Sequence, residues 1–147
     1  MIGLPQAVPD PDVLLAMEPE ELGAKLLFLL RKEAHRAPFI LSNFILELWP
    51  YNLLPGQSSP YPTDRKEEIN LALAEAWSWL IAQGLLVAFP NATGTPAYVL
   101  SRRAKKFADE TEFRGFAASR MLQKDALHPR IASDVWLDSW IGIRRQK

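Results

Sequence analysis

The stretch GLLVAFPNATGTPAYVLSRRAKKF, residues 84–107, decides the fold. Its two apolar runs, LLVAFP and AYVLS, flank a turn-rich segment that contains Gly94, and this pattern predicts two strands joined as a hairpin. Gly84 stands where the preceding helix needs a residue in the left-handed conformation in order to end. Ser101 has a side chain suited to cap a helix that follows the second strand. The stretch therefore predicts a helix end, a hairpin and the start of a basic helix that continues, with a break, to about residue 124.

Three helices are expected before the hairpin. Residues 19–35 carry a proline at the first helical position and leucines at helical spacing, which predicts the first helix. Residues 42–49 form a short apolar pattern that Pro50 ends, and a turn-rich loop follows. The third and clearest helix is predicted over residues 64–83, on an apolar stripe of Ile69, Leu73, Ala76, Trp77 and Leu80.

The order of three helices and a hairpin resembles a winged helix-turn-helix domain. The phrase WSWLIAQGLLVAFP…YVLSRRAKKF is similar to the pattern that winged-helix proteins show around their third helix and their wing. The resemblance implies a mainly α-helical fold with a small β-hairpin over residues 18–107. Residues 1–17, which are rich in proline, are expected to be an extended arm, and residues 108–147 a helical extension.

A second resemblance lies at the C-terminus. The segment LHPRIASDVW, residues 127–136, resembles the opening of the C-terminal helical domain in the prokaryotic Ymh family, whose members occur in phage-related and defence-like contexts. The resemblance implies that the helical extension leads into a further domain, and that any effector activity belongs to that domain.

The charges of the chain are balanced in number but not in position. Lys and Arg total 17, as do Asp and Glu, and a net charge of zero argues against a protein that coats itself with nucleic acid or anionic lipid. Residues 1–100 hold 6 cationic and 11 acidic residues, whereas residues 101–147 hold 11 and 6. If any surface of this chain attracts phosphate, we expect it to come from the last third of the chain.

The residues give little support for catalysis. There is no cysteine, and the two histidines, His35 and His128, lack partners at the spacing of a metal site. No signal peptide and no membrane-spanning run is recognisable. We therefore expect a cytoplasmic, non-enzymatic protein without a metal or another cofactor.

The winged-helix resemblance implies double-stranded DNA as a partner, contacted through the third helix and the wing. The candidate contacts are cations that open the third helix, polar residues of the wing and the basic cluster after it: Arg65, Lys66, Asn91, Thr93, Thr95, Arg102, Arg103, Lys105 and Lys106. Glutamates on the third helix argue against base reading, because DNA phosphates repel them. The alternative is that the basic cluster is a solvated turn.

An apolar segment at the C-terminus suggests protein contacts instead. Residues 136–143, WLDSWIGI, concentrate large apolar side chains, and the candidate interface is Trp136, Leu137, Trp140 and Ile141. This segment either folds back on its own domain or docks on a second copy, giving a homodimer, or on an adjoining effector domain. In the loop before the third helix, Tyr51 and Tyr61 either stack on bases, fill a groove or pack on the core.

Overall fold

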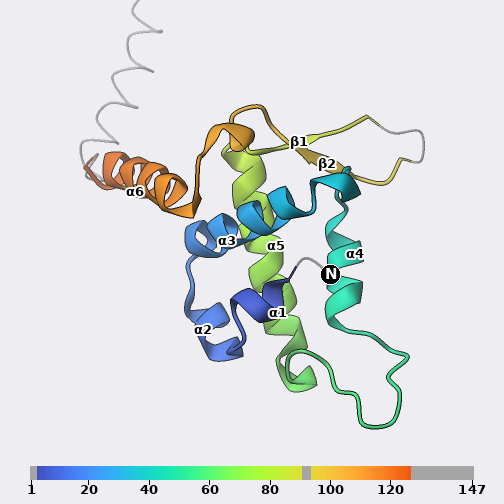
Figure 1. The fold of residues 1–147 in the computed structure, drawn as a ribbon. Coiled ribbons are helices and arrows are strands. Elements are labelled where there is room, and N and C mark those ends of the chain that lie inside the picture. Colours follow the sequence, from blue (N-terminus) through green and yellow to red (C-terminus); the bar gives the residue numbers. More distant parts are fainter. Residues whose placement is uncertain (1–2, 91–93, 127–147) are drawn as a thin grey trace, which may run out of the picture. The chain divides into compact units, whose positions relative to one another are not determined.

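The structure is a computed structural model that describes residues 3–90 and 94–126 (Figure 1). The chain divides into two compact units, residues 1–110 and residues 111–147. The elements in chain order are α1 (Leu4–Ala7), α2 (Pro11–Ala16), α3 (Pro19–Lys32), the 3-10 turn η1 (Ala34–Arg36), α4 (Leu41–Leu48), η2 (Thr63–Arg65), α5 (Lys66–Ala82), β1 (Leu86–Ala88), β2 (Tyr98–Leu100), η3 (Ala104–Lys106) and α6 (Glu110–Ala126).

Helices α3 and α5 form the centre of the first unit, where they cross each other (Figure 1). Pro19 opens α3, and two glutamates in the first turn favour the helix dipole. Gly23 of α3 faces the indole ring of Trp79 on α5, so closely that a Cβ atom at Gly23 would lie 2.8 Å from the ring. The predicted first helix is confirmed, although it ends at Lys32 and is continued by the turn η1.

The predicted extended arm is wrong, because residues 4–16 form two short helices packed on the core. Pro5 lies in the first turn of α1 and Pro11 opens α2, so these prolines begin helices instead of preventing them. The backbone N–H of Asp12 donates to the side chain of Asp10 at 2.9 Å, which caps α2. The side chains of Leu4, Val8 and Leu14 are buried.

The end of α5 has the geometry predicted for Gly84. Gly84 has φ +70°, and its N–H donates to the carbonyl of Ile81 at 3.0 Å. The N–H of Leu85 donates to the carbonyl of Leu80 at 2.9 Å, which completes a Schellman motif, and the Leu85 side chain is buried. The chain is thereby turned from α5 directly into β1.

Strands β1 and β2 pair antiparallel, with Leu86 opposite Leu100, as the hairpin prediction required. A third segment joins this ribbon, because Phe39, between α3 and α4, forms an antiparallel bridge with Tyr98. Just before this bridge, the guanidinium of Arg36 forms an ion pair with the carboxylate of Glu47 on α4. The hairpin is therefore attached by backbone hydrogen bonds to the segment between α3 and α4, and Arg36 connects that segment to α4.

The segment after β2 differs from the predicted helix. The hydroxyl of Ser101 accepts a hydrogen bond from the N–H of Ala104 at 3.2 Å. The segment that follows is the single 3-10 turn η3, and Arg103 occupies its N-cap position. Phe107 then turns extended and buries its ring, while its carbonyl accepts a hydrogen bond from Arg31 at 2.6 Å. These long-range contacts hold Phe107 out of a helical path, and α6 begins only at Glu110.

The fold is thus mainly helical with a small two-stranded antiparallel sheet, as predicted. Within residues 3–90 and 94–126, no helix combines the length and the apolar character needed to cross a membrane. The interface predicted around Trp136 and Trp140 lies outside the described residues.

Candidate nucleic-acid interface

Three cations of the predicted basic cluster share one surface. Arg102, Lys105 and Lys106 are exposed, and within the part of the chain that the structure describes no carboxylate pairs with them. Beside them lies an open hollow of about 710 Å³, which is lined by Gln83, Gly84, Ser101, Arg102, Arg103 and Lys106. Because no acidic side chain lines this hollow, its electrostatic character is cationic and suits an anion.

Arg103 has a structural role within this cluster. Its guanidinium donates a hydrogen bond to the carbonyl oxygen of Gln83, at the C-terminal end of α5. A cation at this position satisfies one of the unpaired carbonyls of the helix and favours the negative end of its dipole. Arg103 therefore fixes the segment that carries the other cations to the end of α5.

Only one of the three polar residues predicted to contact DNA from the hairpin lies among the described residues. Thr95 is exposed before the return strand β2 begins, whereas Asn91 and Thr93 lie outside the described residues. The pairing extends past β1, because the N–H of Phe89 donates to the carbonyl of Ala97 at 2.9 Å. Val87 and Phe89 are exposed on the ribbon, so its outer surface is apolar as well as polar.

The two cations at the start of α5 are engaged by the protein itself. Arg65 forms ion pairs with Asp12 at 2.8 Å and with Glu68 at 3.5 Å. The hydrogen bond to Asp12 raises the pKa of Arg65 above its ordinary value. The ammonium of Lys66 lies 5.9 Å from the centre of the Trp49 ring, within the range of a cation–π contact. Arg65 therefore offers DNA less net charge than the sequence suggested.

The outward face of α5 is acidic and apolar. After Lys66, the exposed residues of this helix are Glu67, Glu68, Leu71, Glu75, Ser78 and Ala82. The one amide near this helix start, that of Asn70, accepts a hydrogen bond from the indole N–H of Trp49 at 2.7 Å. No Lys or Arg follows Lys66 along α5, so this face lacks the side chains that read guanine or pair with phosphates.

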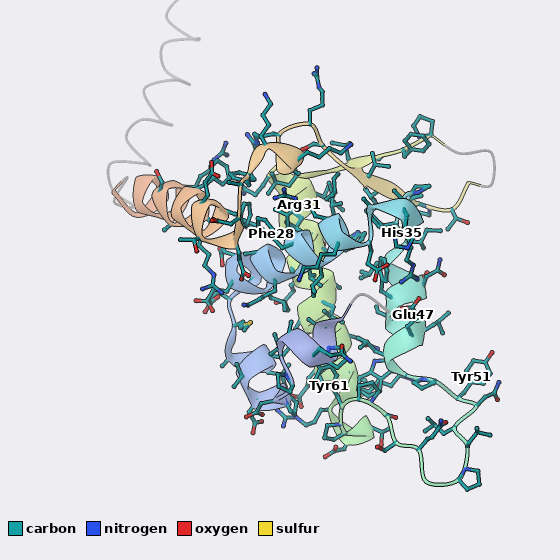
Figure 2. All side chains as sticks on the ribbon, in the orientation of Figure 1. Phe28, Arg31, His35, Glu47, Tyr51 and Tyr61 are labelled. Carbon is teal, nitrogen blue, oxygen red and sulfur yellow. The ribbon has the colours of Figure 1, made fainter. Side chains whose placement is uncertain are left out.

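Tyr51 and Tyr61, in the loop between α4 and η2, lie in different surroundings (Figure 2). Tyr61 is 1% exposed, and its hydroxyl donates to the carbonyl of Val8 at 2.7 Å. Burial raises the pKa of Tyr61 to about 12. Tyr61 is therefore a core residue that attaches the loop to the N-terminal helices. Tyr51 is 85% exposed and remains available for contact.

Sequence reasoning missed the exposed leucines of this loop. Leu53 and Leu54 are 41% and 66% exposed, next to the turn at Pro55 and Gly56. The available signal was the dipeptide Pro-Gly, which favours a tight turn that presents its neighbours to solvent.

His35 lies on the surface beside Glu33. The described residues contain no cluster of three His, Asp or Glu side chains able to hold a metal ion.

The chain was compared with known protein families, curated proteins and solved structures. No protein-family model, no curated protein and no solved structure matches the chain.

Proposed function

We propose that residues 18–107 form a winged-helix module that binds the phosphate backbone of double-stranded DNA. Helix α3, the Phe39 bridge, α4, α5 and the hairpin follow one another in the order of a winged helix, with Phe39 in the place of its first strand. In this interpretation the hairpin is the wing, and the module is cytoplasmic and non-enzymatic.

The observation that carries the proposal is the cationic surface after β2. Arg102, Lys105 and Lys106 are exposed together beside a hollow with no carboxylate in its lining. Lysine and arginine that neutralise phosphates release counterions from DNA, and this supplies affinity independent of base sequence. The acidic outward face of α5 restricts the proposed binding to the backbone, because this face is unsuited to the major groove. We therefore expect binding through the backbone with little preference for sequence.

A salt titration tests the proposal. Fluorescence anisotropy with a random-sequence labelled duplex should show binding at about 50 mM salt that weakens steeply toward about 200 mM. Replacing Arg102, Lys105 and Lys106 together by Gln should reduce the slope of log K against log salt by about 2.7, since each phosphate contact contributes about 0.9. Lys32→Gln is the matched control for Lys106→Gln, because Lys32 is an exposed lysine of α3 outside the cluster.

Two results would contradict DNA binding at this surface. The first is no measurable binding of the natural chain even at about 50 mM salt, where counterion release is strongest. The second is an equal loss of affinity for Lys32→Gln and Lys106→Gln, which would indicate a diffuse effect of charge.

A second candidate function is a protein-interaction adaptor, and the acidic and apolar outward face of α5 favours it. In this alternative the module belongs to a prokaryotic phage- or defence-related system, and its partner is a second copy or an adjoining effector domain. The tail residues Trp136 and Trp140 would contribute to the contact. Self-association that tolerates salt and is lost in the double variant Trp136→Ala/Trp140→Ala would support this alternative.

A further inference from the structure

We propose that the loop between α4 and η2, residues 50–62, is a site of endoproteolytic modification, and that the cleaved chain remains one folded unit. The modifying enzyme is an endopeptidase whose primary pocket accepts a large apolar side chain. Water is the co-reactant, and the bond between the Tyr51 carbonyl carbon and the Asn52 nitrogen breaks. The oxygen of water joins the carbon to form a carboxylate, and its two protons go to the nitrogen, which becomes an ammonium group.

The backbone on both sides of this bond is accessible. Residues 51–58 are all exposed, and Figure 1 shows the loop projecting beyond α4 and α5. Among the described residues, none forms a hydrogen bond with the backbone of Tyr51, Asn52 or Leu53, and the bonded turn that follows begins at Leu54. The segment can therefore enter a protease cleft without breaking any secondary structure, as is typical of exposed loops that are nicked.

The sequence of the loop selects the bond that is cut. Leu54 and Tyr61 are each followed by proline, whose ring replaces the N–H of the scissile bond and crowds the cleft. Tyr51 and Leu53 are followed by residues with an ordinary N–H. Tyr51 is 85% exposed and Leu53 is 41% exposed, so the bond after Tyr51 is the favoured site.

Other exposed apolar side chains are held in regular structure. Outside the loop, the large ones among the described residues are Val13, Leu46, Leu71, Val87 and Phe89. The first three lie within α2, α4 and α5, and Val87 lies within β1. Phe89 precedes a proline, and its N–H is bonded to the carbonyl of Ala97. Cleavage at these positions requires local unfolding first, whereas cleavage of the loop does not.

Contacts between the two fragments hold the cleaved chain together. The indole N–H of Trp49, just before the cut, donates to Asn70 at 2.7 Å, and the hydroxyl of Tyr61, after the cut, donates to the carbonyl of Val8 at 2.7 Å. Contacts farther from the loop also cross the cleavage point, namely Arg65 with Asp12, Arg31 with Phe107 and Phe39 with Tyr98. None of these contacts depends on the covalent link between residues 51 and 52.

Limited digestion of the full chain with chymotrypsin, which has an apolar primary pocket, tests the proposal. Mass spectrometry should identify one fragment that ends at Tyr51 and another that begins at Asn52, and the two should elute together in gel filtration. The melting temperature of the cleaved protein should rise with its concentration, because unfolding now separates two chains. That of the uncleaved chain should be independent of concentration.

Trypsin supplies a matched comparison, because no Lys or Arg lies between Arg36 and Arg65. Leu53→Lys introduces a trypsin site in the loop, and Leu71→Lys introduces one within α5. Leu71 is the more exposed of the two leucines, at 61% against 41%, so side-chain exposure alone would favour cleavage of α5. We expect trypsin to cut Leu53→Lys after residue 53 at least about 100-fold faster than it cuts Leu71→Lys after residue 71, since the helix must open first.

Three results would overturn the proposal. The first is a natural chain that chymotrypsin leaves intact throughout residues 50–62. The second is a pair of fragments that separate in gel filtration at about 10 μM, which would show that the contacts across the cut do not hold them. The third is equal cleavage of Leu53→Lys and Leu71→Lys, which would show that the chain is cut only after unfolding. The digestions contain no DNA, so their outcome is separate from that of the salt titration.

Discussion

Phe39 and Tyr98 exchange two backbone hydrogen bonds, from the N–H of Phe39 to the carbonyl of Tyr98 at 2.7 Å and from the N–H of Tyr98 to the carbonyl of Phe39 at 2.8 Å. This pair connects the segment between α3 and α4 to the return strand of the hairpin. A two-stranded ribbon is marginal by itself in water. The bridge, together with the burial of Phe39, therefore contributes to holding the hairpin and the cations after it in place.

Amide hydrogen exchange measures this connection directly. The amides of Phe39 and Tyr98 should exchange slowly, because their hydrogen bonds open only when the hairpin leaves the helices. The amide of Asn52, in the exposed loop, should exchange much faster and serves as the internal reference. A Phe39 amide that exchanges as fast as that of Asn52 would show that the hairpin is not held to the helical core.

The contact between Gly23 and Trp79 predicts a large effect of one methyl group. In Gly23→Ala the new Cβ atom would lie 2.8 Å from the Trp79 ring, so either this ring or the two helices must shift. We expect the free energy of unfolding to fall by about 1–3 kcal/mol, as for other overpacked cores. Chemical denaturation measures this change.

Gly115 supplies the matched control, because it is a helical glycine with nothing within 4 Å of an added Cβ atom. Gly115→Ala should leave stability unchanged or raise it by up to about 1 kcal/mol, through the gain in helix propensity. Equal losses in the two variants would contradict the close approach of α3 and α5. Recovery of stability in Gly23→Ala/Trp79→Leu would support it.

The central helices and the hairpin could be predicted because their signals are local. The apolar stripe of α5 and the left-handed residue at Gly84 both act within a few residues of chain. The N-terminal helices could not be predicted in this way. Pro5 and Pro11 are compatible with either an extended arm or a helix start, and the choice between them is made by tertiary burial of Leu4 and Leu14.

In the candidate site, too, the local features could be predicted and the long-range contacts could not. That the cationic residues follow the hairpin is evident from the sequence, and the structure places Arg102, Lys105 and Lys106 on an exposed surface. The partners of other candidates are distant in the chain. Arg65 pairs with Asp12, which no local pattern connects to it. Such pairs arise only once α2 has packed near the start of α5, so spacing along the sequence carries no trace of them.

Arg102 and Arg103 should differ in their effect on stability although they are neighbours of the same type. Arg103 donates to the carbonyl of Gln83, so Arg103→Gln should lower the free energy of unfolding by about 0.5–1.5 kcal/mol. Arg102→Gln should leave it within about 0.5 kcal/mol, because Arg102 is an exposed surface residue. Thermal unfolding of both variants measures the difference. A larger loss for Arg102→Gln would contradict the capping role of Arg103.

Tyr61 should make the stability of the fold fall in strongly alkaline solution. Burial raises its pKa to about 12, from an ordinary value of 10.0. Below pH 10 both the folded and the unfolded chain hold the phenolic proton, so the contribution of Tyr61 is complete and constant. Between pH 10 and 12 the unfolded chain releases this proton first, and stability falls by up to about 1.4 kcal/mol per pH unit.

Comparing variants isolates the contribution of the Tyr61 hydroxyl. Tyr61→Phe should cost about 1–2 kcal/mol at pH 7, because the carbonyl of Val8 loses its donor. The same variant should lose stability less steeply than the natural chain between pH 10 and 12. Tyr51→Phe, at a tyrosine that is 85% exposed, should match the natural chain at every pH. Urea denaturation as a function of pH measures all three proteins, and parallel curves for Tyr61→Phe and the natural chain would show that the Tyr61 hydroxyl is not buried.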